Sequence, residues 1–264
     1  MTRPIVFLTD YGLSDPWVGI CHGVMHRIAP DARVIDLTHA VPRQDVLRGA
    51  IELGRATRYM PDDAVYVAVV DPGVGSRRRA VALAAGDSLL VGPDNGVLSL
   101  AWDALGGAGE TVSIEREDVV LAPVSRTFHG RDVFCPVAAH LATGRALAEL
   151  GPAVDAATLH RVDVPSPMVT PGGVGTRVTV VDGFGNVQLN ATVADLEAAG
   201  VADERVLVVN GRRLPRAGTF AELPEREPGI LVDSEGFLAV VVNHGSGAAT
   251  MRLGAGDAVV LERP

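Results

Sequence analysis

The chain has 264 residues and a formal net charge of −9, with 47% hydrophobic and only 4% aromatic residues. This length favours two domains, and the composition predicts cores packed from aliphatic side chains. The acidic balance, without an extended basic run, argues against nucleic acids and anionic membranes as partners. No apolar run reaches the length of a membrane-spanning helix.

Strands and helices are predicted to alternate in the first part of the chain. Apolar runs predict strands at residues 5–8, 34–35, 67–70 and 89–91. Helical periodicity predicts helices at residues 16–28, 46–59 and 97–105, and an apolar helix at 133–141. This alternation predicts a three-layer α/β domain whose sheet is mainly parallel and covered by helices on both faces.

Polar side chains follow all four predicted strands. They include Asp10, Asp36, His39, Asp71 and Asp94. Because the carboxyl ends of parallel strands meet at one edge of a sheet, where α/β proteins bind ligands, these residues predict a site. Asp71 is followed directly by Pro72 and Gly73, so by itself it would read as a turn cap.

The pattern of predicted elements changes after residue 163. Residues 164–173 contain three prolines and two glycines and predict an extended linker. We therefore expect a first domain at 1–163 and a second at 174–264. The second is predicted to be a smaller all-β domain, barrel-like or sandwich-like, with strands at 174–181, 206–209, 230–232, 237–242 and 258–261. One helix is predicted at 193–199, capped by Asn190 or Thr192.

Two further motifs carry chemistry. In FHGRD at 128–132, His129 stands at a loop-to-helix junction and could be a base, a ligand or a capping side chain. In DGFGN at 182–186, a ring and an amide on a glycine-rich turn suit a purine. Phe184 would stack on the base and Asn186 would bond to its edge, although an ordinary hairpin with a packed phenylalanine is the alternative.

Five motifs in order resemble those of the S-adenosylmethionine hydroxide adenosyltransferase family. They are TDYG at 9–12, DPGVGSRR at 71–78, GPDNG at 92–96, FHGRD at 128–132 and DGFGN at 182–186. The resemblance extends from Phe7 to about Leu261. It implies cleavage of S-adenosylmethionine by water to adenosine and L-methionine, without a metal or other cofactor. It also implies a homotrimer with sites between subunits.

The family is related to fluorinating and chlorinating enzymes, from which an Asp-Arg-His set separates it. The matching catalytic residues here are Asp71, Arg78 and His129, although Arg77 and Arg79 leave room for a one-residue shift. Methionine leaves a sulfonium as a neutral group, so no general acid is needed. The set would hold a water in line behind C5′ and accept its proton. Which member accepts the proton stays open.

The resemblance also implies substrate contacts. Asp10 would accept both ribose hydroxyls. The other implied contacts are Phe184 and Asn186 for adenine, Asp182 and Ser234 for methionine, and Phe237 beside them. The halogenating relatives carry tryptophan at Gln44 and arginine at Glu235, so the partner of the methionine carboxylate is unassigned here. The side chain of His244 has no assigned role either.

Three other functions are compatible with parts of the sequence. A halogenase is disfavoured by the Asp-Arg-His set. A metal-dependent hydrolase could use Asp10, Asp36, His39 and Asp71, but the spacing of His22 and His26 lacks the glutamate of the HExxH pattern. A non-catalytic sensor of S-adenosylmethionine or adenosine would return its ligand intact.

Cellular location is predicted from two features. Cys21 and Cys135 are isolated in apolar surroundings, so we expect buried, reduced thiols. The first predicted strand begins close to the N-terminus and leaves no room for a signal peptide. Both features predict a cytoplasmic protein.

Overall fold

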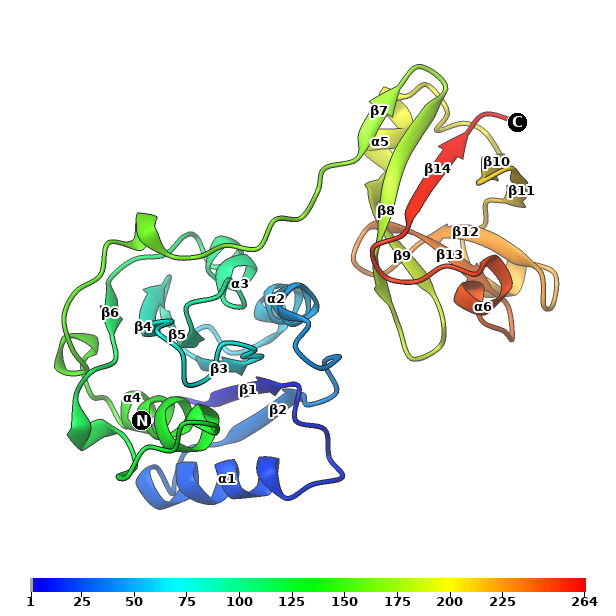
Figure 1. The fold of residues 1–264 in the computed structure, drawn as a ribbon. Coiled ribbons are helices and arrows are strands. Elements are labelled where there is room, and N and C mark those ends of the chain that lie inside the picture. The colour runs from blue at the N-terminus through cyan, green and yellow to red at the C-terminus, as the bar shows by residue number, and fades with distance from the viewer. Residues whose placement is uncertain (1) are drawn as a thin grey trace. The chain divides into compact units, whose positions relative to one another are not determined.

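The computed structural model of the protein describes residues 2–264, and these form two compact units (Figure 1). The boundary lies between Asp163 and Val164. Each unit has a hydrophobic core of its own. Every helix among the described residues is too short or too polar to cross a lipid bilayer.

A six-stranded sheet forms the centre of the N-terminal unit, in the order β2-β1-β3-β5-β4-β6. Its strands are β1 (Ile5–Thr9), β2 (Val34–Thr38), β3 (Val65–Val69), β4 (Ala80–Ala85), β5 (Ser88–Pro93) and β6 (Thr111–Ser113). β1, β2, β3 and β5 run parallel, whereas β4 runs antiparallel to β5 and to β6. The predicted α/β domain with a mainly parallel sheet is confirmed.

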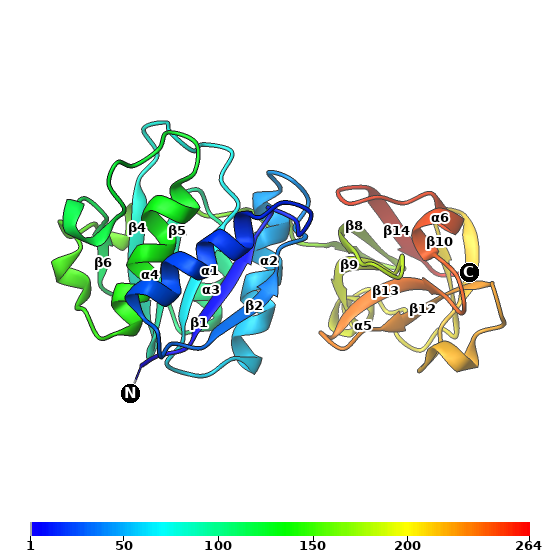
Figure 2. The ribbon, with the colours of Figure 1, turned by 90° about the horizontal axis from the view of Figure 1, so that it is seen from below.

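Two pairs of helices cover the two faces of this sheet. The pair α1 (Trp17–Ile28) and α4 (Cys135–Ala142) covers one face, and the pair α2 (Val46–Ala56) and α3 (Ser99–Ala104) covers the other (Figure 1, Figure 2). Along β1, Phe7 packs into the first layer and Leu8 into the second. A strand buried on both faces therefore reads as an unbroken apolar run.

The sequence does not reveal β4 and β6. β4 has the sequence AVALAA, and alanine has a low preference for strands. β6 is only three residues long. Both strands form because they extend an existing sheet between two buried layers, and this tertiary context outweighs local preference.

The C-terminal unit is an antiparallel sheet in the order β11-β10-β14-β8-β9-β13-β12, with β7 paired to β8. Its strands are β7 (Met168–Thr170), β8 (Gly173–Val181), β9 (Val187–Thr192), β10 (Val206–Val209), β11 (Arg212–Pro215), β12 (Pro228–Val232), β13 (Phe237–Val242) and β14 (Ala258–Glu262). Two short helices, α5 (Val193–Ala198) and α6 (Gly247–Met251), accompany it. A bridge between Arg216 and Ile230 brings the two edges together, so the sheet is nearly closed. The predicted β domain is confirmed.

Two local predictions need correction or refinement. The expected linker at residues 164–173 contains β7, because the three residues between Pro167 and Pro171 keep their N–H groups and pair with β8. The start of α5 is capped by Thr192, whose side chain forms a capping box with Asp195. Asn190, the alternative cap, instead accepts the N–H of Arg177 at 2.8 Å.

Candidate active site

Asp71, Arg78 and His129 meet beyond the carboxyl end of β3. Nε of Arg78 lies 3.0 Å from Oδ1 and 3.1 Å from Oδ2 of Asp71, and Nη2 also donates to Oδ2. The same Nη2 lies 2.8 Å from Nδ1 of His129. The side chains of Asp71 and Arg78 are only 5% and 11% exposed, so solvent screens this ion pair weakly. The ring of Phe134 lies 5.1 Å from the guanidinium and helps to hold it.

Burial sets the charge state of His129. Burial lowers the pKa of the imidazole below its ordinary value, and the positive charge of Arg78 lowers it further. Asp71 opposes this shift without cancelling it. His129 is therefore neutral near pH 7, although an unperturbed histidine would be partly charged.

The neighbouring arginine belongs to a different interaction. Nε of Arg79 lies 2.7 Å from Oδ2 of Asp94, and its Nη2 lies 2.7 Å from the carbonyl oxygen of Thr158. Asp94 also accepts the N–H of His160 at 2.8 Å. Arg78, and not Arg79, is therefore the arginine that contacts Asp71 and His129. Asp94 ties the rim of β5 to residues 155–160.

Two glycines allow the loops that carry Arg78 and His129 to approach their neighbours. A Cβ on Gly75 would lie 2.3 Å from the carbonyl oxygen of Arg126, and the φ of Gly75 is +76°. A Cβ on Gly130 would lie 2.0 Å from the hydroxyl of Tyr11. Both distances are far inside van der Waals contact, so a side chain at either position would displace the loops that carry Arg78 and His129.

The segment after His129 is a π-type turn over Gly130–Phe134, which continues into α4. Such turns are frequent at functional sites. Asp132 is buried, and its Oδ2 accepts the N–H of Ser125 at 2.9 Å and a hydrogen bond from Arg131 at 2.9 Å. The acidic end of the FHGRD motif therefore shapes the loop that presents His129.

Asp10 lies directly after β1 on the same edge of the sheet. Its Oδ2 accepts the N–H of Gln44 at 2.8 Å. Gln44 has a φ of 64°, in the left-handed region that side chains rarely adopt, so this contact depends on an unusual backbone conformation. Gln44 thus contributes its backbone, and not its side chain, to the contact with Asp10.

Tyr11 follows Asp10 in the chain and has no role assigned from the sequence. Its ring packs edge-on against Phe128 at 5.5 Å, and its hydroxyl faces Gly130. Burial raises the pKa of Tyr11 well above its usual value, and nearby negative charges, including those of Asp10 and Asp71, contribute further. Tyr11 therefore stays neutral. The signal in the sequence is its place in the TDYG motif.

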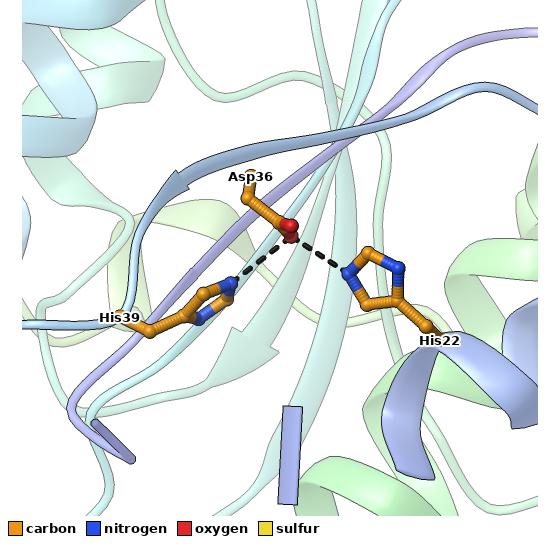
Figure 3. A group of neighbouring side chains, drawn as sticks. All are labelled: His22, Asp36 and His39. Atoms are coloured by element: carbon orange, nitrogen blue, oxygen red, sulfur yellow. Dashed lines mark hydrogen bonds and ion pairs between the residues drawn. The ribbon is translucent and has the colours of Figure 1, made fainter. Parts of the chain in front are cut away.

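A second polar cluster joins α1 to β2 (Figure 3). Nε2 of His22 lies 2.8 Å, and Nε2 of His39 lies 3.0 Å, from the same Oδ1 of Asp36. Within residues 2–264, these three side chains come close enough to surround a metal ion. The four-residue metal cluster considered from the sequence, with Asp10 and Asp71, is not the group that the structure assembles.

In the C-terminal unit, the DGFGN motif forms the tip of the β8–β9 hairpin. Oδ1 of Asp182 accepts the N–H groups of Phe184 and Asn186 at 2.9 Å each, and its Oδ2 accepts the side chain of Asn186 at 2.8 Å. Asp182 therefore organises the turn, and its expected contact with methionine stays a prediction. The ring of Phe184 is 84% exposed and open to stacking.

Ser234 and Phe237 lie on another turn, between β12 and β13. Asp233 shapes this turn, because its Oδ1 accepts the N–H of Glu235 at 2.8 Å and that of Phe237 at 3.0 Å. The register pairs Phe237 with Thr192 at the end of β9, whereas Val187 follows the DGFGN tip at its start. The side chain of Gln188, also near that start, donates to Asp233, so the turn that bears Ser234 contacts the part of β9 next to the DGFGN tip.

Both cysteines are free and buried. Burial raises the pKa of the Cys135 thiol well above its usual value, and its contact with Cys21 adds to this. The sulfur of Cys135 is therefore not a reactive thiolate near neutral pH.

Comparison with known proteins agrees with this arrangement. The model for the N-terminal domain of the SAM hydroxide adenosyltransferases matches residues 5–151, and the model for the C-terminal domain matches residues 176–260. A protein of Salinispora arenicola named (R)-S-adenosyl-L-methionine hydrolase is 51% identical over 255 residues, covering 96% of this chain and 95% of that protein. The chain therefore belongs to the SAM hydroxide adenosyltransferase family.

Two further proteins are similar to this chain. A crystal structure of an uncharacterized conserved protein from Thermotoga maritima matches with a TM-score of 0.90 and 34% identity, covering 98% of this chain and 100% of that chain. A fluorinase of Actinoplanes is 29% identical over 290 residues, covering 98% of this chain and 97% of that enzyme. The halogenating relatives are thus more distant than the hydrolase.

Proposed function

We propose that this protein hydrolyses S-adenosylmethionine to adenosine and L-methionine by attack of water on C5′ of the ribose. The observation that carries the proposal is the hydrogen-bonded Asp71–Arg78–His129 network at the carboxyl edge of the sheet. It occurs in a chain 51% identical, over nearly its whole length, to a protein named for this hydrolysis.

The donor and acceptor capacity of the three side chains supports a role for each member of the network. A guanidinium can only donate, so Nδ1 of His129 accepts from Arg78 and the neutral ring carries its proton on Nε2. The backbone of Ser125 is also a partner of this ring, so a water would share the Nε2 donor with it, and His129 has no lone pair left for the water's proton. Asp71 uses three of about four acceptor positions on Arg78. We therefore assign Asp71 as the proton acceptor and His129 as the donor that orients the water.

The reaction needs little beyond alignment and this base. The carbon–sulfur bond breaks with its electron pair going to sulfur, and the sulfonium leaves as a neutral thioether without a general acid or a metal. The new bond forms between the water oxygen and C5′. A positioned base contributes roughly 10²–10⁴ in rate. In-line alignment and exclusion of bulk water supply the remainder. We therefore propose that the protein needs no metal and no cofactor.

Substrate contacts follow from the same proposal. The carboxylate of Asp10 would accept the two ribose hydroxyls, since an ionised acid suits a bidentate contact. Phe184 would stack on adenine and Asn186 would bond to its edge. The similarity to the hydrolase suggests that the (R) configuration at sulfur, which that protein's name specifies, is the preferred form here as well. We assign Ser234 and Phe237 to the methionine end.

The active unit is proposed to be a homotrimer in which each site uses residues of two subunits. The proposal draws on the family resemblance and on the division of the substrate residues between two compact units, with Asp10 in one and Phe184 in the other. A location in the cytoplasm is proposed from the two free, buried cysteines.

Product analysis tests the proposed function. The protein is incubated separately with the (R) and (S) forms of S-adenosylmethionine in chloride-containing buffer, and the nucleoside products are identified by mass. We expect adenosine and methionine in equal amounts, formed faster from the (R) form. A ligand returned intact would indicate a sensor, and a 5′-halogenated nucleoside would indicate a halogenase. Either result would contradict the proposal.

A further inference from the structure

The ring of His39 is held from three sides. Its Nε2 lies 3.0 Å from Asp36 (Figure 3). Its Nδ1 lies 2.9 Å from Oγ1 of Thr9, and Phe7 packs edge-on against it at 4.8 Å. The side chain of His39 is only 3% exposed. Catalysis as proposed above does not use it, so this degree of constraint calls for another explanation.

The hydroxyl of Thr9 fixes the tautomer of His39. Thr9 is fully buried, and its Oγ1 already accepts the N–H of Tyr11 at 3.2 Å. If its own proton goes to Nδ1 of His39, the ring carries a proton on Nε2 and donates it to Asp36. The other tautomer would leave the hydroxyl proton without an acceptor among the contacts of residues 2–264, which is costly in a buried position. Nε2 is therefore a donor and not a free metal ligand.

The neighbours of His39 keep it in this state. Burial acts to raise the pKa of Asp36, but hydrogen bonds from His39 and His22 outweigh burial and lower the pKa. Asp36 is thus ionised and accepts from both rings. The cluster drawn in Figure 3 orients His39 and leaves its Nδ1 directed at Thr9.

His39 contacts the chain on both sides of Asp10. Through Thr9 it supports the N–H of Tyr11, and its carbonyl oxygen accepts the N–H of Gly12 at 2.7 Å. The side chain of Asp10 is held from elsewhere, by the N–H of Gln44. The backbone of the loop between β1 and α1 is therefore fixed to His39, whereas the carboxylate itself is directed by Gln44.

We propose that His39 is a positioning residue that fixes the loop bearing Asp10, and through it the ribose of the substrate. The proposal rests on the proposed function, in which Asp10 binds the ribose hydroxyls. A loosened loop weakens the ribose contact in the ground state and in the transition state alike, so the loss falls mainly on binding.

Two substitutions at one position separate the bonds of His39. His39→Asn places an amide oxygen near the position of Nδ1 and keeps an acceptor for Thr9, whereas His39→Gln places its amide near Nε2 and keeps only the donor to Asp36. We expect His39→Gln to raise the KM for S-adenosylmethionine and the Kd for adenosine about tenfold, with a smaller change in kcat. His39→Asn should raise both constants less. Equal damage by the two variants would overturn the proposal.

A threonine pair provides a second test if His39→Gln does not fold. Thr9 and Thr38 end neighbouring strands, and each hydroxyl accepts the N–H two residues onward. Thr9→Val should reproduce the loss of binding, whereas Thr38→Val should not. Amide hydrogen exchange of Gly12 gives a readout independent of function, and it should accelerate in Thr9→Val alone.

Failure of the two proposals can be told apart. If Gly12 exchanges faster in Thr9→Val but Asp10→Ala binds adenosine normally, the positioning stands and the ribose role of Asp10 is wrong. If Asp10→Ala abolishes binding while exchange and KM are unchanged in Thr9→Val and His39→Gln, His39 is not a positioning residue.

Discussion

Arg78 and His129 are joined by a hydrogen bond of 2.8 Å in which the arginine can only be the donor. The lone pair of the imidazole is therefore directed at a guanidinium. A histidine that acts as a general base would instead direct this lone pair at the group that it deprotonates. His39 is held in the same tautomer, with its proton on Nε2, by Thr9. In the proposed mechanism, His129 and His39 both act as oriented donors near a carboxylate.

The first prediction concerns the proposed base. Asp71→Asn removes the negative charge and one acceptor, so kcat should fall about 10²–10⁴-fold while the Kd for S-adenosylmethionine changes little. Single-turnover rates and calorimetry measure the two quantities. Asp87→Asn, an exposed site, is the control for the chemical change. A variant that binds tenfold more weakly but turns over normally at saturation would make Asp71 a binding residue.

The second prediction concerns pH. Because burial and Arg78 lower the pKa of His129, the neutral ring persists below the ordinary histidine pKa of about 6.5. Protonation would place an N–H against Arg78 and break the network, so kcat should fall only as pH drops through this lowered pKa. His129→Gln should lose this acid limb along with most activity. If the kcat of the wild type instead falls around a pH above 6.5, the pKa of His129 is not lowered.

The same shift predicts the pH dependence of stability. Above the unfolded pKa of histidine the ring is neutral in both states and contributes nothing. As pH falls below about 6.5, the unfolded chain binds the proton first, and His129 then destabilises the fold. The stability lost between pH 7 and pH 5.5, measured by urea unfolding, should be smaller in His129→Gln than in the wild type. An equal loss in both proteins would contradict the assignment.

Substitutions of the adjacent residues Arg78 and Arg79 should affect catalysis and stability differently. Arg78→Lys keeps the charge but loses the planar fork that reaches Asp71 and His129, so kcat should fall while Tm changes modestly. Arg79→Lys disturbs the bonds to Asp94 and Thr158, so stability should fall by about 1 kcal/mol with kcat retained. Rates and thermal unfolding of both variants decide this. The reverse pattern would move the catalytic arginine to Arg79.

Gly130 and Tyr11 should be coupled. Gly130→Ala places a methyl group 2.0 Å from the hydroxyl of Tyr11, and the resulting overpacking should cost about 1–3 kcal/mol of stability. Tyr11→Phe removes that oxygen and should restore part of the loss in the double variant. Denaturant unfolding of the two single variants and the double variant gives the coupling energy. A purely additive cycle would show that the two groups do not meet.

Mixing inactive variants tests the proposed shared site. Asp10→Ala and Asn186→Ala alter different units of the chain, so each mixed trimer would regain one intact site among its three interfaces, which is about a quarter of all interfaces after random mixing. The control mixes Asp10→Ala with Asp71→Asn, which lie in the same unit, and no activity should return. Activity is measured after reversible dissociation and proven subunit exchange. If the first mixture stays inactive, each site lies within one chain.

Much of the fold could be predicted because its signals are local. β1, β3 and β5 are apolar runs that end in turns, so the sequence alone indicates the sheet and the edge at which Asp10 and Asp71 lie. β4 and β6 could not be predicted, since an alanine-rich run and a three-residue strand depend on the sheet that they join.

The site could be predicted in part for the same reason. The choice between Arg78 and Arg79 depends on which way a glycine-rich loop turns, and this is decided by contacts such as that of Gly75 with Arg126. The hydrogen bonds that Asp182 accepts within its own turn could not be predicted from the sequence either. The cluster at His39 needs α1 and β2 side by side, which no local pattern reveals.

The central claim is that solvent water attacks C5′, and oxygen-18 labelling tests it most directly. The protein is incubated with S-adenosylmethionine in oxygen-18 water, and both products are analysed by mass. We predict one oxygen-18 atom in the adenosine, at C5′, and none in the methionine. Adenosine that carries only ordinary oxygen would contradict the account.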